Sequence, residues 1–214
     1  MTMPTHAARR SAVLPFVAAM AAVVVLSNVL VQHPVRASLG GIDLADTLTW
    51  GAFTYPVAFL VTDLANRRLG AAAARRVVVA GFVVAVVLSV WLATPRIAIA
   101  SGSAFLAAQL LDVAVFDRLR RGAWWRAPLV SSALGSLVDT AIFFALAFTP
   151  LFGALDFGGE SGSLGFPVPL LGAGPAEVPL WVSLALGDLI VKALVALALI
   201  GPYGLLRGRE PAAA

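Results

Sequence analysis

The chain has 214 residues, of which 60% are hydrophobic and 12% are charged, about half of the charged fraction of an average soluble domain. Its 15 Lys and Arg residues outnumber its 11 Asp and Glu residues, but most of them flank long apolar runs, where anionic lipid and not nucleic acid is the expected partner. The absence of cysteine excludes disulfides, thiolate metal sites and cysteine nucleophiles.

Six long apolar runs organise the chain. Each is roughly 15 to 20 residues long, the length at which a helix crosses a hydrocarbon layer ~30 Å thick. The first run is too long for a cleavable signal peptide, and no A-x-A-like site follows it. We therefore expect an all-α membrane protein in which six transmembrane helices form a bundle. The runs are Leu14–Val31, Leu48–Thr62, Val77–Leu92, Ile97–Phe116, Leu129–Phe148 and Trp181–Ile200.

The number of basic residues alternates along the chain. The segments outside the apolar runs carry 2, 1, 4, 1, 4, 0 and 2 of them. Because Lys and Arg in short loops stay in the cytoplasm, both termini are predicted to lie inside. The chain then divides into a cytoplasmic tail of residues 1–13, a transmembrane domain of residues 14–203 and a cytoplasmic tail of residues 204–214. So few residues outside the membrane leave no room for a soluble catalytic domain.

One connection is much longer than the others. It runs over residues 150–180, and the stretch Leu151–Leu180 holds seven Gly and four Pro, too many for a regular element; the charge rule places it outside. This external loop is either a lid over an outward-facing site or an insertion without a specific role, and we prefer the second interpretation.

Three charged residues fall inside the last two runs. A charge at mid-membrane costs about 2.5–3.5 kcal/mol on insertion, so it usually faces a partner or a cavity. Asp188 and Lys192 are four residues apart and share a helix face, while Asp139 lies at a similar depth in the neighbouring run. We predict that Lys192 pairs with Asp139, Asp188 or both. The pair either docks two helices or lines a substrate pocket; we prefer the pocket, since one lysine does not need two carboxylates.

Other polar residues are less specific. Asn28 and Gln32 lie four apart near the outer end of the first run, where amides either read a polar ligand edge or bond a neighbouring helix. Gln109 and Asp112 lie toward the inner half of the fourth run, and Asp112 is a candidate gating residue. Two further acids close to the cytoplasmic edge are expected to pair with neighbouring arginines; they are Asp63 and Asp117.

The second run begins with a cluster of aromatic residues. Trp50 and Tyr55 fit an aromatic belt at the outer boundary. Pro56 permits a broken helix, however, and such a break is tolerated where it lines a cavity. Together with Phe53, these rings would then form a stacking wall for a flat heterocycle. Both interpretations stay open.

No enzyme signature competes with a transport function. The chain contains no H-E-x-x-H, no G-x-S-x-G and no P-loop. Asp112 and Asp139 lack the Y-D and G-x-G-D contexts of intramembrane aspartyl proteases. We therefore expect no catalytic residue, no metal and no cofactor.

Several longer segments resemble the queuosine precursor transporters of the vitamin uptake transporter family. The resemblance runs in order from residue 27 to residue 203. It departs at Ser136, where relatives carry Asn, and at Arg67, near which many relatives carry an acid. The segments are Ser27–Gln32, Thr49–Pro56, Phe59–Leu64, Gly70–Arg76, Arg96–Ser101, Gln109–Arg120, Trp124–Pro128, Val138–Phe148 and Asp188–Lys192.

The resemblance implies a substrate and a site. It implies uptake of 7-cyano-7-deazaguanine or 7-aminomethyl-7-deazaguanine across the cell inner membrane for tRNA modification, and a bundle like the substrate-binding subunits of energy-coupling-factor transporters. A carboxylate would accept from the guanine-like edge, an amide or ammonium would donate to O6, and aromatic rings would cover the flat face. The candidate substrate-binding residues are Asn28, Gln32, Trp50, Phe53, Tyr55, Gln109, Asp139, Asp188 and Lys192.

Two alternatives remain. The chain is either a capture subunit for a related vitamin or base that needs an ATP-driven partner, or a non-transporting membrane assembly factor. A small-xxx-small pattern, Ala18 to Ala22, would suit docking of such a partner, but chance explains it better in so alanine-rich a chain. We expect transport without a dedicated ATPase.

Overall fold

Seven α-helices and four short strands form the regular structure of residues 6–40, 42–46, 48–156 and 164–208, which are those that the computed structural model describes. The α-helices are α1 (His6–Leu30), α2 (Gly51–Thr54), α3 (Pro56–Leu69), α4 (Ala71–Leu92), α5 (Pro95–Leu119), α6 (Arg126–Phe148) and α7 (Leu180–Leu206). The strands are β1 (Ser38–Leu39), β2 (Ile42–Asp43), β3 (Pro167–Pro169) and β4 (Glu177–Pro179). Three 3-10 helices cover Leu44–Asp46, Pro150–Leu155 and Leu170–Gly172.

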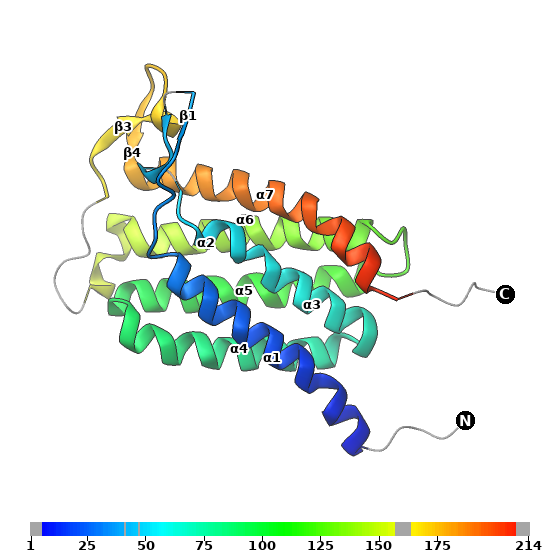
Figure 1. The fold of residues 1–214 in the computed structure, drawn as a ribbon. Helices are drawn as coiled ribbons and strands as arrows, with labels where there is room; N and C mark the ends of the chain where they lie inside the picture. The colour runs from blue at the N-terminus through cyan, green and yellow to red at the C-terminus, as the bar shows by residue number, and fades with distance from the viewer. Residues whose placement is uncertain (1–5, 41, 47, 157–163, 209–214) are drawn as a thin grey trace.

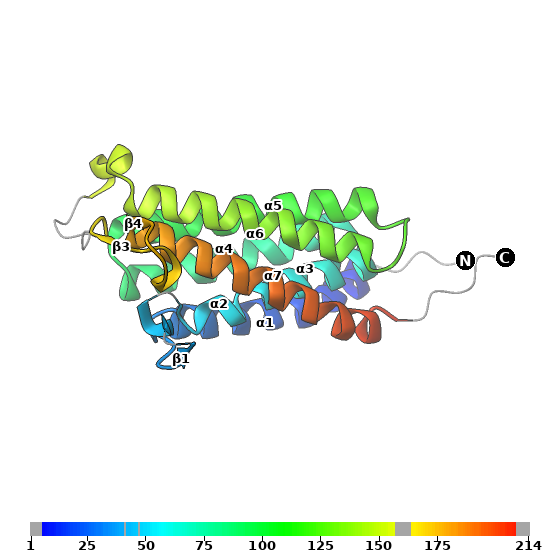
Figure 2. The same cartoon turned by 90° about the horizontal axis from the view of Figure 1, so that it is seen from above.

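Among the described residues, five helices are long and apolar enough to cross a membrane. They lie along one another as an elongated bundle (Figures 1 and 2), as expected of an all-α membrane protein. These candidate spans are Ala12–Leu30, Ala71–Leu92, Pro95–Leu119, Arg126–Phe148 and Leu180–Leu206.

The second apolar run folds as two helices and not as one. α2 ends at Thr54 and α3 begins at Pro56, whose missing N–H cannot continue the hydrogen-bond ladder. The backbone N–H of Tyr55 still donates to the carbonyl of Gly51 over 2.9 Å, so the chain keeps a helical course across the break. α3 then continues to Leu69, seven residues beyond the predicted end of the run at Thr62.

α3 occupies the centre of the bundle. It contacts α1, α4, α5, α6 and α7, and its polar residues before the last turn are as buried as its apolar ones: Phe59, Asp63 and Asn66 are at most 1% exposed. Hydropathy therefore underestimated its length, because a helix surrounded by other helices does not need an apolar surface. The long helices around it turn apolar side chains outward instead, such as Val90 and Trp91 on α4.

Glycines let the helices approach closely at two crossings. A Cβ atom at Gly135 of α6 would lie 2.7 Å from Cε1 of Phe59 on α3, and one at Gly81 of α4 would lie 2.5 Å from Cγ of Met20 on α1. Small residues at helix crossings are typical of membrane bundles, where packing drives association.

The ends of the bundle differ from the predicted boundaries. The predicted cytoplasmic tail of residues 1–13 is helical from His6 onward, and α7 extends to Leu206. Residues 1–5 and 209–214 of the two predicted tails, and residues 157–163 of the long loop, lie outside the described residues.

The described part of the long loop contains regular structure, which corrects the expectation of none. β3 pairs antiparallel with β4, with Val168 opposite Val178. Leu171 adopts a positive φ of 53°, and its backbone N–H donates to Oγ of Ser183 on α7 over 2.8 Å. The glycines and prolines shape tight turns in a folded cap. This hairpin and the β1–β2 hairpin lie at the end of the bundle opposite to the two termini (Figure 1).

The side chain of Arg96 caps the C-terminus of α6, at the hairpin end of the bundle. It lies in the first turn of α5 and is only 6% exposed. Its Nε atom donates to the carbonyl of Leu146 over 2.9 Å, and its Nη2 atom donates to the carbonyl of Thr149 over 2.5 Å. Carbonyls in the last turn of a helix lack intrahelical partners, so the guanidinium satisfies the end of α6.

Candidate functional site

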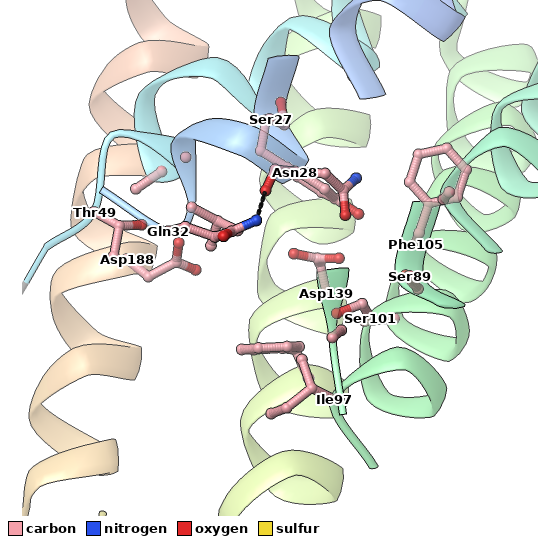
Figure 3. A pocket seen from close by; sticks show the side chains of 18 of the residues that line it. Ser27, Asn28, Gln32, Thr49, Ser89, Ile97, Ser101, Phe105, Asp139 and Asp188 are labelled. Atoms are coloured by element: carbon pink, nitrogen blue, oxygen red, sulfur yellow. Dashed lines mark hydrogen bonds between the residues drawn. The ribbon is translucent and has the colours of Figure 1, made fainter. Parts of the chain in front are cut away.

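A cavity of about 540 Å³ lies in the half of the bundle nearer the hairpins (Figure 3). Its volume falls within the range of about 300–1,000 Å³ that small-molecule sites typically have. All seven helices contribute to its walls, which are mostly apolar. A few polar side chains interrupt them, and in Figure 3 Asn28, Asp139 and Asp188 lie around a common space.

Lys192 is the centre of the polar wall. Its Nζ atom lies 2.7 Å from Oδ2 of Asp139 on α6 and 2.5 Å from Oδ2 of Asp188 one turn earlier on α7. The side chains of Lys192 and Asp139 are each 6% exposed, and that of Asp188 is 18% exposed. The pairing predicted for these residues therefore forms with both carboxylates.

Thr140 completes this cluster, and sequence reasoning missed it. Its Oγ1 atom donates to Oδ2 of Asp188 over 2.8 Å and accepts from Nζ of Lys192 over 3.3 Å. Among the described residues, Oδ1 of Asp188 has no hydrogen-bond partner, although Asp188 lines the cavity. Its place directly after Asp139 in the sequence could have identified Thr140 as a candidate site residue.

Tyr55 brings the break between α2 and α3 into the site. The Nζ atom of Lys192 lies 5.2 Å from the centre of the Tyr55 ring, within the distance of a cation–π contact. Tyr55 also lies beside Asp139 and packs edge-on against Phe105. The aromatic cluster therefore contributes one ring to the cavity wall.

Two amide side chains near the end of α1 add further polar groups to the cavity wall: Asn28 lies in the helix and Gln32 just beyond it. Nδ2 of Asn28 donates to the carbonyl of Val24 over 2.9 Å, and Nε2 of Gln32 donates to the carbonyl of Asn28 over 3.2 Å (Figure 3). Each amide group has two N–H hydrogens and a carbonyl oxygen, so one hydrogen and the oxygen of each remain available. Both residues line the cavity.

Three candidate residues are not brought to the cavity. Trp50 and Phe53 pack on each other, with ring centres 5.6 Å apart, and are 47% and 37% exposed. They point away because α2 turns only Gly51 and Ala52 toward the cavity. Gln109 is fully buried and accepts a hydrogen bond from Thr62 over 2.6 Å.

Phenylalanines that sequence reasoning did not select form much of the apolar wall. Phe143 and Phe144 pack edge-on with ring centres 5.1 Å apart. In a run where nearly every residue is apolar, hydropathy alone cannot tell a lipid-facing phenylalanine from one in a cavity. The phenylalanines of the wall are Phe105, Phe143, Phe144 and Phe148.

The two acids expected at the cytoplasmic edge behave differently. Asp117 pairs with Arg120 over 3.2 Å at the surface, as predicted. Asp63 does not pair with an arginine among the described residues: it is 1% exposed, accepts from Oγ of Ser131 over 3.3 Å and lies beside Asp112. The prediction for Asp63 was wrong because α3 continues past this residue to Leu69, and the neighbouring helices enclose it there.

The sequence of this chain is similar to known transporters. "Queuosine precursor transporter" of Escherichia coli (strain K12) is 40% identical over 147 residues, which are 59% of this chain and 64% of the relative. "Probable queuosine precursor transporter" of Haemophilus influenzae is 37% identical over 153 residues, 59% of this chain and 65% of the relative. A protein of the same name from Bacillus subtilis (strain 168) is 30% identical and is covered over 59% of its length. The chain thus spans less than two thirds of each relative's length.

These relatives are named as transporters and not as enzymes. No solved structure matches the chain. The sequence model of a family described as "Putative vitamin uptake transporter" matches residues 49–93 and 89–206, well over half of the chain. The protein therefore belongs to the vitamin uptake transporter family.

Proposed function

We propose that this chain takes up queuosine precursors, 7-cyano-7-deazaguanine and 7-aminomethyl-7-deazaguanine, across the cell inner membrane. One observation carries the proposal: a buried lysine and two carboxylates, Lys192, Asp139 and Asp188, stand at the wall of an otherwise apolar cavity. Buried charges inside a membrane bundle mark substrate or ion pathways. The names of the relatives supply the substrate class.

The cavity offers complementary groups for each edge of a deazaguanine. The ring donates from N1–H and from its exocyclic amine, and Oδ1 of Asp188 is an acceptor without a partner among the described residues. Nζ of Lys192 has three hydrogens, and three oxygens from Asp139, Asp188 and Thr140 lie around it. The substrate O6 atom therefore takes its hydrogen bond from one of the amides, Asn28 or Gln32.

The flat face of the base would stack on aromatic side chains. Tyr55 and Phe105 pack edge-on, with ring centres 6.2 Å apart, and both line the cavity. A wall of this kind accepts a planar heterocycle by burial of apolar area, and the polar cluster then sets its orientation. The resulting substrate-binding residues are Asn28, Gln32, Tyr55, Asp139, Asp188 and Lys192.

The proposed topology has six spans with both termini in the cytoplasm. α2 and α3 together form the span that is broken at Tyr55. Arginines at the termini end of the bundle, such as Arg67, Arg75 and Arg120, favour a cytoplasmic location for that end. The cavity then lies in the outer half and is loaded from outside. We propose a general likeness to the substrate-binding subunits of energy-coupling-factor transporters.

We propose further that uptake needs no separate ATPase module. The competing possibilities, a capture subunit that depends on an ATPase and an assembly factor that binds no ligand, become outcomes of the test. Neither has a specific structural feature of the described residues in its favour.

The test uses a strain that cannot synthesise the deazaguanine precursor. Expression of the protein should restore queuosine in tRNA when either precursor is supplied, and guanine, adenine and biotin should not compete. Asp188→Asn at matched expression serves as the control for the site. Restoration without the protein would disprove transport, and restoration only with a co-expressed ATPase would favour the capture subunit.

A further inference from the structure

A second polar cluster lies on the termini side of the cavity, where α3, α5 and α6 meet. Its members are fully buried, none being more than 1% exposed, and none of them lines the cavity. The cluster is therefore separate from the Lys192 site. It consists of Thr62, Asp63, Asn66, Gln109, Asp112 and Ser131.

Hydrogen bonds hold this cluster together in layers. Thr62 on α3 donates to Oε1 of Gln109 on α5 over 2.6 Å. One residue further along α3, Asp63 accepts from Ser131 on α6 over 3.3 Å and lies beside Asp112 on α5. Two acidic side chains from different helices thus meet in the interior of the bundle.

The cluster leaves several polar atoms without a partner. Both carboxylate oxygens of Asp112, Oδ1 of Asn66 and Nε2 of Gln109 are buried and lack a hydrogen-bond partner among the described residues. Oγ of Ser136 on α6 is in the same condition. Buried polar atoms without partners are rare in folded proteins and need an explanation, such as a bound ion.

The ion pairs of the described residues do not include the two acids. Among the described residues, neither Asp63 nor Asp112 forms an ion pair. The other charged side chains described at this end are engaged elsewhere or exposed: Arg118, Arg121 and Arg126 are exposed, and Arg207 lies over the ring of Trp124. Arg67 donates to the carbonyl of Arg120 and Arg68 to that of Leu206, Arg120 pairs with Asp117, Tyr203 of α7 packs on Phe116, and Arg75 and Arg76 at the start of α4 are exposed.

We propose that Asp63 and Asp112 form a proton-binding site that couples proton entry to transport. Two neighbouring carboxylates cannot both stay ionised in a low-dielectric interior without a counter-charge, whereas a shared proton removes one charge and supplies a hydrogen bond between them. A proton needs neither a hydration shell nor a set of ligands. Na⁺ needs several oxygen ligands and sheds or keeps a hydration shell on entry, whereas every member of this cluster is at most 1% exposed.

A line of polar residues joins the proton site to the substrate site. Ser131, Ser136 and Asp139 lie on the buried face of α6. Eight residues separate Ser131 from Asp139, about 12 Å at ~1.5 Å rise per residue, and the unpartnered Ser136 lies between them. Buried polar residues of one helix thus extend from the acidic pair, which Ser131 contacts, to the Asp139–Lys192 contact. This coupling, unlike the proton site itself, rests on the proposed function.

The proton site is tested on the purified full-length protein by infrared spectroscopy. A protonated carboxyl group gives a carbonyl band that shifts in D₂O. The wild-type protein should show this band at neutral pH, and the double variant Asp63→Asn/Asp112→Asn should lose it. Asp117→Asn, which removes an exposed acid from the same helix α5, should keep it. A band that is absent from the wild type or persists in the double variant overturns the proposal.

Coupling is tested in proteoliposomes with labelled 7-cyano-7-deazaguanine. We expect the wild type and Asp117→Asn to accumulate it when the outside is made acidic. Asp63→Asn and Asp112→Asn should still exchange labelled substrate across the membrane when there is no pH gradient. With the gradient, they should accumulate about tenfold less substrate than the wild type. Two results with the wild-type protein alone would overturn the coupling: accumulation that a Na⁺ gradient drives instead, or accumulation that does not depend on the pH gradient. If no labelled substrate enters at all but the infrared band is present, the proposed function fails and the proton site stands.

Discussion

Thr140 on α6 donates a hydrogen bond to Oδ2 of Asp188 on α7 over 2.8 Å. This bond fixes the acid that shares Lys192 with Asp139, so the carboxylate cannot rotate freely in the cavity wall. The threonine thereby leaves Oδ1 of Asp188 as the oxygen available to a ligand.

Replacing Thr140 by valine should loosen this arrangement. The change keeps the shape of the side chain but removes two hydrogen bonds, the one to Asp188 and the one from Lys192, each of which typically contributes about 0.5–1.5 kcal/mol. We expect a modest loss of thermal stability and a raised KM for precursor uptake. Thr149→Val is the matched control, because its hydroxyl bonds only the carbonyl of Ala145 on its own helix. Equal effects of the two substitutions on KM would show that Thr140 has no role in positioning Asp188.

Neutralising either acid of the substrate site should weaken substrate recognition without preventing folding. Asp139→Asn and Asp188→Asn keep the side-chain size but lose a charged acceptor next to Lys192. We expect at least one variant to fold normally and to lose uptake about tenfold, which corresponds to roughly 1.4 kcal/mol. Wild-type uptake by both variants, at matched expression and thermal stability, would show that the acids are only structural.

Removing the lysine should damage the fold itself. Lys192→Met leaves two carboxylates facing each other without their cation, and breaking a buried pair costs about 3–5 kcal/mol. We expect little folded protein by size-exclusion chromatography in detergent. Adding Asp139→Asn and Asp188→Asn to the same chain should restore much of the folded protein but not uptake. A stable Lys192→Met single variant would contradict the burial of the pair.

The crossing of α3 and α6 should tolerate no added methyl group. In Gly135→Ala, the new Cβ atom would lie 2.7 Å from Cε1 of Phe59, and overpacking of this kind costs about 1–3 kcal/mol. Gly201→Ala is the control, since that glycine lies in α7 with no atom within 4 Å of the added Cβ. The unfolding temperature should fall for Gly135→Ala and stay unchanged for Gly201→Ala. Equal unfolding temperatures of the two variants would mean that the helices can separate at this crossing.

The sequence predicted the charged part of the site better than its apolar part. Lys192, Asp139 and Asp188 could be placed together because charges are rare in apolar runs and their depth follows from helical rise. The aromatic wall could not be predicted, since Phe143 or Phe148 has the same hydropathy whether it faces lipid or a cavity.

The same reasoning explains the errors in the fold. Hydropathy ends the second run at Thr62, because Asp63 and Asn66 look like the start of a polar loop. In the structure these residues lie inside a ring of helices, where burial depends on neighbours and not on lipid. The broken helix at Tyr55 was open to prediction from Pro56, whereas the length of α3 depended on contacts that only the tertiary structure provides.

The buried position of Arg96 changes how the charges of this chain direct its insertion. Its guanidinium is held by two carbonyl groups at the end of α6 and lies 4.0 Å from Asp156. An arginine held by protein groups in this way retains its loop in the cytoplasm less strongly than a solvated arginine does. In the proposed orientation, Arg96 therefore opposes translocation of its loop only weakly. Substituting Arg96 should therefore leave the orientation of the protein unchanged while unwinding the last turn of α6.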